Sequence, residues 1–250
     1  MAKNKLKKFE EMAGYGHVFQ ADFEDLKKEG FEMKGRWNQQ FFKNDQPLVL
    51  ELGCGKGEYT VGLAKLFPNK NFIGIDIKGA RMHSGATEAK ELGLNNVAFV
   101  RTRIEFITSF FAANEVDEIW VTFPDPQMKK PRKRLVGTTM LKRYNTFLKP
   151  GGLVHLKTDS RFLHTYVNEL FKANNIQPVV NLDDLYHSGY DDEILGIQTY
   201  YESKWLNHGL AIKYVQFRLE DAEQLQEPDV EIEFDNYYNA GRGVKIRENK

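Results

Sequence analysis

The sequence is poor in cysteine, which limits the kinds of site it can build. Cys54 is the single cysteine among 250 residues, so an intramolecular disulfide and a cysteine-rich zinc site are both excluded. The six histidines show no spacing typical of metal ligands, so we expect no metal. Any chemistry in this chain therefore has to come from its other side chains or from a bound organic cofactor.

Long hydrophobic runs are also missing. No apolar segment approaches the roughly 20 residues that are needed to span a bilayer. The N-terminal segment "MAKNKLKKFEEM" is charged and lacks the apolar core of a secretory signal. We therefore expect a cytoplasmic protein without a membrane partner.

The chain has no formal net charge, because 35 lysines and arginines balance 35 aspartates and glutamates. This balance conceals local clusters. Residues 129–134 contain five cations, and residues 1–8 contain four lysines. Residues 220–235 carry eight carboxylates and no basic residue, and we expect this acidic stretch to be solvated or to shield the basic cluster. The local clusters, rather than the overall charge, are the guide to binding partners.

What the sequence does contain is an alternation of short apolar runs and helical segments from residue 47 onward. Apolar residues make up 41% and aromatic residues 13%, which is enough for a substantial core. This alternation predicts an α/β fold with an open, mostly parallel sheet covered by helices on both faces. From periodicity and breakers, the predicted strands are 47–52, 71–77, 97–101, 116–123, 153–159 and 176–180, and the predicted helices are 57–67, 79–93, 104–112, 138–148 and 160–174.

The last third of the chain departs from this alternation. Residues 199–209 have the pattern of a helix, and residues 210–220 alternate apolar and polar side chains, as a half-exposed antiparallel edge strand does. With this strand the predicted sheet has seven strands. We expect a basic N-terminal extension over 1–45, a central domain over 46–220 and a tail over 221–250.

The segment "VLELGCGKGEY" places a glycine turn where the first strand ends and the first helix begins. Gly53, Gly55 and Gly57 have the spacing G-x-G-x-G, which differs from that of dinucleotide-binding turns and of phosphate-binding loops. Glu51, just before the turn, would repel a pyrophosphate but attract a cation. The sequence therefore favours S-adenosylmethionine, which carries a sulfonium and no phosphate, over a dinucleotide. A glycine-rich turn without a ligand is the alternative.

Asp76 ends the second predicted strand, about 20 residues after the glycines. An acidic residue in this position usually accepts hydrogen bonds from ribose hydroxyls. It fits an adenosine-containing cofactor of either kind, and it belongs to the same edge of the predicted sheet as the glycine turn.

Asp125 follows the fourth predicted strand and lies between two prolines in "FPDP". Pro124 and Pro126 restrict the backbone on both sides of it. A carboxylate held beside a methyl donor could orient an acceptor and offset positive charge that forms on it. The alternative is a surface turn in which this motif merely ends a strand.

The five cations of 129–134 come directly after this motif. Such a density of positive charge favours a polyanionic partner, and nucleic acid is the usual one because phosphate contacts dominate its affinity. The alternative is a solvated loop.

At this point the sequence resembles the bacterial tRNA (guanine-N7)-methyltransferases, which modify a guanosine at position 46 in the variable loop of tRNA. The matching motifs occur in the family's order over about residues 47 to 219, and "FPDP" with its basic run and a downstream T-x-x-E are the most specific. They are "ELGCGKG", "GIDI", "FPDP" with the Lys/Arg run, "KTDSRF" and "TYYESKW".

The resemblance implies a Rossmann-like, class I S-adenosylmethionine-dependent methyltransferase that acts on tRNA. Asp125 would be the catalytic residue and would also line the cofactor site. The motifs do not cover the basic N-terminal extension, which we expect to be either flexible or in contact with the RNA. The implied cofactor-binding residues are Glu51, Gly53, Gly55, Asp76, Arg103 and Asp125. The implied substrate-binding residues are Lys129, Asp159, Thr199, Tyr200, Tyr201 and Glu202, and the implied RNA-binding residues are Lys130, Arg132, Lys133 and Arg134.

The chain departs from the family pattern at two places. Gln127 and Met128 follow "DP", where the family often has Trp-Pro or Trp-His. Arg103 stands where the family often has an aspartate near the adenine, and a guanidinium cannot accept a hydrogen bond from the adenine amino group. Backbone groups would then have to contact the adenine.

Methylation of guanine N7 requires no general base, because N7 is an unprotonated lone pair at neutral pH. We therefore expect Asp125 to act by orientation and by stabilising positive charge. Two other functions remain open: a methyltransferase of the same fold that acts on another RNA, a small molecule or a protein, and a non-catalytic RNA-binding protein. The sequence leaves both a monomer and a homodimer possible.

Overall fold

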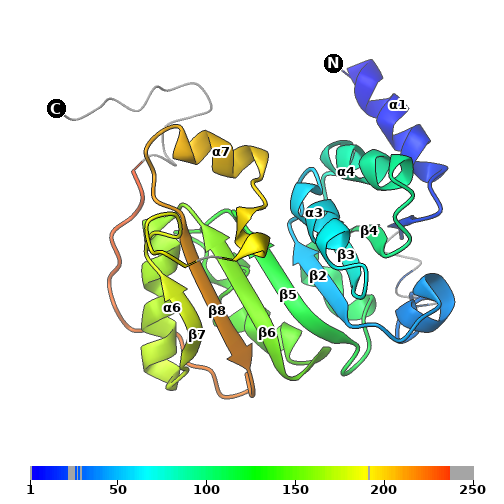
Figure 1. The fold of residues 1–250 in the computed structure, drawn as a ribbon. Coiled ribbons are helices and arrows are strands. Elements are labelled where there is room, and N and C mark those ends of the chain that lie inside the picture. The colour runs from blue at the N-terminus through cyan, green and yellow to red at the C-terminus, as the bar shows by residue number, and fades with distance from the viewer. Residues whose placement is uncertain (1, 22–25, 27, 29, 191, 237–250) are drawn as a thin grey trace.

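The computed structural model describes residues 2–21, 26, 28, 30–190 and 192–236. Eight strands form one sheet in the order β1-β4-β3-β2-β5-β6-β8-β7 (Figure 1). The pairs from β1 through to β6 are parallel, and β8 is antiparallel to both β6 and β7. The predicted α/β class, with a mostly parallel sheet and an antiparallel C-terminal strand, is confirmed. The strands are β1 (Val18–Gln20), β2 (Leu48–Leu52), β3 (Asn71–Asp76), β4 (Val97–Arg101), β5 (Val116–Thr122), β6 (Leu148–Thr158), β7 (Pro178–Leu182) and β8 (Lys213–Leu219).

The sheet differs from the prediction in two respects. It has eight strands rather than seven, because β1 comes from the N-terminal extension and pairs with β4, with Val18 beside Phe99. β8 is not the edge strand predicted for 210–220, because β7 pairs with its outer side. The alternating pattern of β8 arises inside the sheet: Val215 and Phe217 are buried, whereas Arg218 between Phe217 and Leu219 is exposed.

Helices cover both faces of the sheet, as predicted. On one face, helices α3 and α4 pack in a cluster with Trp120 and Tyr214. On the other face, α5 and α6 pack in a cluster with Trp37. No helix in the described ranges is long and apolar enough to cross a membrane. The helices are α1 (Ala2–Ala13), α3 (Glu58–Leu66), α4 (Gly79–Glu91), α5 (Thr138–Tyr144), α6 (Arg161–Asn174) and α7 (Tyr200–Leu206), with shorter helical segments η1 (Trp37–Phe42), η2 (Ile104–Ser109), η3 (Pro131–Lys133) and η4 (Glu193–Gly196).

Parts of the N-terminal extension pack against the central domain. Helix α1 lies beside α4 in Figure 1, and Glu11 Oε2 is 2.6 Å from His83 Nε2. The buried indole of Trp37 donates a hydrogen bond to the Phe110 carbonyl at 3.0 Å. The division of the chain at residues 45 and 220 remains a prediction, because these contacts tie the extension to the sheet without marking a boundary.

The acidic stretch 220–235 is not simply solvated. Its side chains Ala222 and Leu225 belong to the core. The Glu227 carboxylate accepts hydrogen bonds from the hydroxyls of Tyr166, at 2.8 Å, and Thr138, at 2.5 Å. Asp235 accepts hydrogen bonds from the backbone and hydroxyl groups at the start of α6. The described part of the tail therefore runs across α5 and α6 as a bound segment.

The glycine turn after β2 depends on close packing against α4. Gly53, Gly55 and Gly57 have φ values of +80°, +57° and +77°, a region that strongly favours glycine. A Cβ atom on Gly85 in α4 would lie 2.6 Å from the Lys56 carbonyl oxygen and 2.9 Å from Gly57 Cα. Only a glycine at position 85 lets α4 approach the turn this closely, so α4 fixes where the turn lies.

We predict that Gly85→Ala destabilises the protein. In an exposed helix interior the change from glycine to alanine would stabilise by about 1 kcal/mol. Here the added methyl group meets backbone atoms, so we expect the free energy of unfolding in urea to fall by about 1–3 kcal/mol. Gly16→Ala is the control, because no atom lies within 4 Å of the position that its added Cβ would take. A Gly85→Ala variant as stable as the wild type would contradict this account of the turn.

Candidate active site

The carboxyl ends of β2, β3 and β5 meet at one edge of the sheet. The strand order reverses between β2 and β5, because the chain runs from β2 to β3 and β4 on one side and then to β5 on the other. Ligands of open α/β sheets bind outside the carboxyl ends of the strands at such a point. A cavity of about 490 Å³ lies here, lined by Gly53, Asp76 and Asp125 among others. Three of the residues predicted from the sequence therefore share one cavity.

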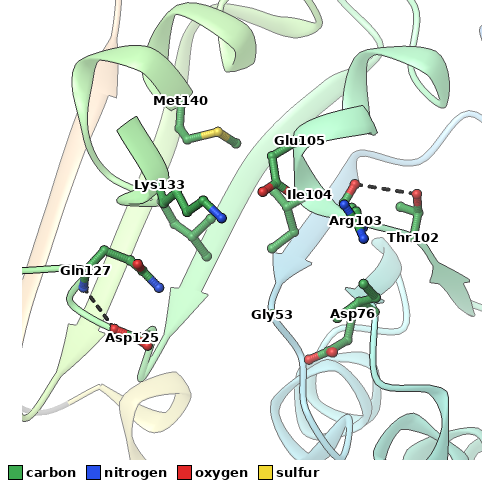
Figure 2. Close-up of a pocket in the computed structure, with 12 residues that line it drawn as sticks. Gly53, Asp76, Thr102, Arg103, Ile104, Glu105, Asp125, Gln127, Lys133 and Met140 are labelled. Carbon is green, nitrogen blue, oxygen red and sulfur yellow. Dashed lines mark hydrogen bonds between the residues drawn. The ribbon is translucent and has the colours of Figure 1, made fainter. Parts of the chain in front are cut away.

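Figure 2 shows this cavity between two walls. Asp125, Gln127, Lys133 and Met140 lie on one side, and Asp76, Thr102 and Arg103 lie on the other. Carboxylates, cations and apolar side chains all reach the cavity, so it can take a ligand with both a flat apolar part and polar groups. The apolar lining comes from Ile77, Ile104, Leu135 and Met140.

A second cavity of about 430 Å³ adjoins the first, since Gly53, Asp76 and Asp125 line both. Thr199 and Tyr201 of the α7 region contribute to its wall. We call these the first and the second cavity. Their shared wall holds Asp125, so a group bound in one cavity would lie beside a group bound in the other.

Asp76 ties the turn after β2 to the turn after β3. Its Oδ2 accepts a hydrogen bond from the backbone N–H of Gly55 at 2.9 Å, and its Oδ1 accepts one from Lys78 N–H at 2.7 Å. A carboxylate has about four acceptor positions, so each oxygen keeps capacity for a ligand hydroxyl. The carboxylate can therefore shape the turn and bind a ligand at the same time.

Glu51 is placed differently from the other two acidic residues. Its side chain is 3% exposed and is not among the described residues that line either cavity. Oε2 accepts hydrogen bonds from the backbone N–H of Thr60, at 2.8 Å, and from its hydroxyl, and Oε1 accepts one from the Thr122 hydroxyl at 2.7 Å. Burial raises the pKa of Glu51 to about 7, although these hydrogen bonds oppose the shift. Glu51 therefore joins β2, α3 and β5 behind the glycine turn.

Asp125 sits in a strained loop. Phe123 and Gln127, two residues away on either side, have φ values of +47° and +48°, which non-glycine residues rarely adopt. Asp125 Oδ1 accepts a hydrogen bond from the backbone N–H of Gln127 at 2.9 Å, and its side chain is exposed to the cavities. Backbone strain of this kind concentrates at functional sites. The loop presents this carboxylate in a fixed orientation.

Four of the five cations in 129–134 are exposed. Lys129 and Lys130 lie on the loop that follows Asp125, Arg132 and Lys133 belong to η3, and Lys133 also lines the first cavity. Their ammonium and guanidinium groups can reach an anionic partner at the rim of the site. This placement agrees with the role predicted for the run, except at its last position.

Arg134 is the exception, because it is 7% exposed. Its guanidinium carbon lies 4.9 Å from the ring centre of Phe162 and 4.3 Å from that of Tyr166. Nη2 donates a hydrogen bond to the Met128 carbonyl at 3.0 Å. In this position Arg134 closes the loop onto α6 and does not face the surface, so the structure does not favour the phosphate contact predicted for it.

The substrate-binding residues implied by the resemblance fall into two groups. Lys129 and Tyr200 are exposed, and Thr199 and Tyr201 line the second cavity. Asp159 and Glu202 are 2% and 0% exposed and are not among the described residues that line either cavity. The first group lies where a substrate could touch it, whereas the second lies within the protein.

The cavity also contains residues that the sequence analysis did not single out. Glu105 adds a carboxylate two residues after Arg103, and Thr102 adds a hydroxyl group. Met140 reaches the cavity from α5, which is distant in sequence from the glycine turn. Of these, only Glu105 had a sequence signal, namely an acidic residue at the start of the predicted helix that follows the third predicted strand. In the described part of the chain no group of three or more acidic, histidine or cysteine side chains is placed to bind a metal.

Comparison with known proteins gives consistent results. A family described as "Putative methyltransferase" matches residues 45–215. A tRNA (guanine-N(7)-)-methyltransferase of Bacteroides thetaiotaomicron is 56% identical over 245 residues, which cover 98% of this chain and 97% of the relative. An enzyme of the same name from Porphyromonas gingivalis is 56% identical over 237 residues, covering 92% of this chain and 97% of the relative.

Among solved structures, the 16S rRNA methyltransferase KamB superposes with a TM-score of 0.58 at 13% identity. The match covers 78% of this chain and 96% of KamB. At this identity the likeness concerns the fold alone, and it confirms the predicted Rossmann-like class I methyltransferase fold.

We predict that Glu51 makes stability fall as the pH rises toward neutrality. The folded-state pKa of about 7 exceeds the ordinary value of 4.5, so the folded state binds the proton more tightly than the unfolded state does. The favourable contribution is complete below pH 4.5 and is lost as the pH rises through 7. Glu51→Gln keeps an acceptor for Thr60 and a donor for Thr122 but cannot ionise.

The free energy of unfolding in urea, measured from pH 5 to pH 8, checks this prediction. Relative to Glu51→Gln, the wild type should lose up to about 3 kcal/mol over this range. Two parallel pH profiles would show that the Glu51 carboxyl is not perturbed.

Proposed function

We propose, because this chain belongs to the family of the tRNA (guanine-N7)-methyltransferases, that it transfers the methyl group of S-adenosylmethionine to N7 of a guanine in tRNA. We further propose that this guanine is at position 46 in the variable loop. The observation that carries the proposal is that the glycine turn, Asp76 and Asp125 share one cavity, which Lys133 of the exposed basic run also lines.

The first cavity fits S-adenosylmethionine by its chemistry. Ile77 and Ile104 offer apolar surface for the adenine, and Asp76 offers carboxylate oxygens for the ribose hydroxyls. We propose that Arg103 binds the cofactor by contacting the adenine through its backbone and not through its guanidinium. When bound, this cosubstrate supplies a methyl group on a positively charged sulfur. We assign the adjoining second cavity to the target guanine.

The acidic residues suit a cationic ligand in different ways. The Asp125 carboxylate lies at the wall shared by both cavities and is the group that we place beside the reacting atoms. Glu51 is buried behind the turn, and a cation in the cavity would favour its ionised form and lower its pKa. We therefore propose that Glu51 supports the cofactor through the turn and its charge, and that Gly53 and Gly55 let the backbone approach the ligand.

Asp125 acts on the reaction by orientation and charge. Guanine N7 already presents a lone pair, so no side chain has to remove a proton. Positive charge moves onto the purine as the methyl group is transferred, and a carboxylate fixed by the strained loop stabilises that charge without reorganising. Holding the purine in line with the methyl group provides the remaining acceleration.

The exposed cations and α7 complete the substrate side of the proposal. Phosphates near the target nucleotide would be bound by Lys129, Lys130, Arg132 and Lys133. The positive charge of these side chains would offset the repulsion between the RNA phosphates and the Asp125 carboxylate. Thr199 and Tyr201 would face the nucleotide from the second cavity, and Tyr200 would meet the RNA outside it. Asp159, near Lys213 at the end of β6, would shape the site from beneath its surface.

A tRNA substrate agrees with the predicted cytoplasmic location, and either a monomer or a homodimer would serve this reaction.

The proposal is tested by incubating the protein with methyl-labelled S-adenosylmethionine and unmodified tRNA. We expect label in tRNA, and strand scission at position 46 after mild reduction and aniline treatment, which detect 7-methylguanine. A tRNA with adenine at position 46 should remain unlabelled. Label in another RNA or in small molecules only, or binding of tRNA with no transfer, would replace this function by one of the two alternatives.

In this assay we predict a separation between turnover and binding for Asp125. Asp125→Ala should lower kcat by about 10²–10³-fold, because a preorganised charge is removed from the transition state. The dissociation constant for tRNA should change by less than about 2-fold. Asp125→Asn is the control for orientation, because it retains an acceptor for the Gln127 N–H. Equal decreases in turnover and tRNA affinity would contradict the role assigned to Asp125.

We also predict that the exposed cations determine the salt dependence of tRNA binding. Replacing Lys130, Arg132 and Lys133 by alanine should reduce the slope of log K against log[salt] by about one unit for each phosphate that is no longer bound. Lys65→Ala, an exposed lysine at the far end of α3, is the control and should leave the slope unchanged. An unchanged slope in the triple variant would remove these side chains as phosphate contacts.

A further inference from the structure

An ion pair is completely buried beside the second cavity. Lys157 Nζ, on β6, lies 2.7 Å from Glu202 Oε1, on α7, and both side chains are 0% exposed. Removing two charges from water is costly unless their geometry and remaining hydrogen bonds are good. Lys157 was not among the residues predicted for the site, and Glu202 was predicted to contact the substrate, so the pair needs an explanation of its own.

The remaining donors of Lys157 bind the segment that leads into α7. Its Nζ donates hydrogen bonds to the carbonyl oxygens of Leu195, at 2.6 Å, and Ile197, at 3.3 Å. The ammonium also lies 5.4 Å from the ring centre of Tyr59, on α3. Lys157 therefore connects the sheet to the chain immediately before Thr199.

Glu202 has its own set of partners inside the protein. Its Oε1 accepts a hydrogen bond from the Tyr186 hydroxyl at 2.8 Å, and its Oε2 accepts one from the Thr199 N–H at 3.4 Å. The Thr199 hydroxyl in turn accepts a hydrogen bond from the Glu202 N–H at 3.1 Å. This reciprocal pair is a capping box, which explains why threonine and glutamate are three residues apart at the start of α7.

The same helix carries side chains to the second cavity. Thr199, Tyr201, Lys204 and Trp205 line it together with Asp125. Helix α7 is short, so its placement depends on what holds its first turn. The ion pair, the capping box and the two carbonyl contacts of Lys157 all act on that turn.

We propose that Lys157 and Glu202 are a positioning pair: they hold the first turn of α7 so that Thr199 and Tyr201 face the target nucleotide, and Glu202 does not touch it. The proposal rests on the proposed function and differs from the substrate contact that the resemblance implied for Glu202. For Glu202 to turn toward a nucleotide, Lys157 would have to remain buried without its counter-ion, and the capping box would have to open.

Single and paired substitutions separate the two roles of Glu202. Glu202→Gln and Lys157→Met each leave one buried charge without its partner, so both should lower kcat at least about 10-fold at a temperature where the variants are folded. The double variant Lys157→Met/Glu202→Gln has no buried charge, and the amide group that replaces the carboxylate would retain hydrogen-bonding atoms for Tyr186 and for Thr199. If the pair positions α7, the double variant should be faster than both single variants; it should stay below the wild type, because the Leu195 and Ile197 carbonyls lose the donor that Lys157 supplies.

The opposite result would overturn the proposal. If the Glu202 carboxylate contacts the nucleotide, the double variant remains as slow as Glu202→Gln. If either single variant unfolds, the comparison is made with Tyr186→Phe, which removes only one hydrogen bond to Glu202 and should lower kcat by a few fold. Unchanged kcat in Tyr186→Phe and in the folded single variants would also overturn it.

A readout independent of activity keeps this test separate from that of the proposed function. Amide hydrogen exchange of residues 200–206 should be faster in each single variant than in the wild type, and slower in the double variant than in either single variant. Lys70→Met/Glu118→Gln is the matched control, because Lys70 Nζ and Glu118 Oε2 form an ion pair 3.0 Å long near the amino ends of β3 and β5. It should leave both kcat and α7 exchange unchanged.

Failure of the proposed function and failure of the positioning pair would give different experimental results. A wild-type protein that transfers no methyl group to tRNA would contradict the proposed function, while hydrogen exchange would still report on the positioning of α7. If the wild type methylates tRNA but the amides of α7 exchange no faster in either single variant than in the wild type, only the positioning pair is contradicted.

Discussion

The hydrogen bonds from the Gly55 and Lys78 backbones to the Asp76 carboxylate are the interaction on which the site depends. They join the turn after β2 to the turn after β3 at the point where the strand order reverses. The turn can take this shape because Gly53, Gly55 and Gly57 adopt positive φ values, and Gly85 lets α4 pack directly beneath it. A displacement of Asp76 would therefore move both the turn backbone and the carboxylate that we propose to bind the cofactor.

Three acidic residues at neighbouring strand ends perform three different tasks because their environments differ. Asp76 is half-buried and bonded to backbone N–H groups, so it shapes the turn. Asp125 is exposed to both cavities on a strained loop, so its charge is available to a ligand. Glu51 is buried among threonines, and its raised pKa makes its charge responsive to a cation nearby. Residue type alone would not have distinguished these tasks.

The sequence could predict those features of the fold and the site that are encoded locally. The strand ends, the glycine turn and the Asp125 motif lie within a few residues of each other or at regular positions of an alternating α/β pattern, so parallel pairing brings them to one edge. Features that depend on distant partners could not be predicted. Arg134 is identical in type to Arg132, and only the rings of Phe162 and Tyr166, on a helix beyond the next strand, decide that it is buried. Glu202 faces inward because Lys157, on β6, offers it a cation.

The acidic tail and the basic run share a physical arrangement that explains how a chain without net charge can present a cationic surface. Arg134 anchors the end of the run under α6, which leaves the four preceding cations on the surface. Glu227 binds Tyr166, one of the two rings that hold Arg134, and the Asp235 backbone N–H lies 3.2 Å from Met128 Sδ in the same loop. The tail thus supports the loop through specific contacts, and none of its described carboxylates is among the residues that line the first or the second cavity. Four cations of the run therefore remain exposed next to the site although the total charge of the chain is zero.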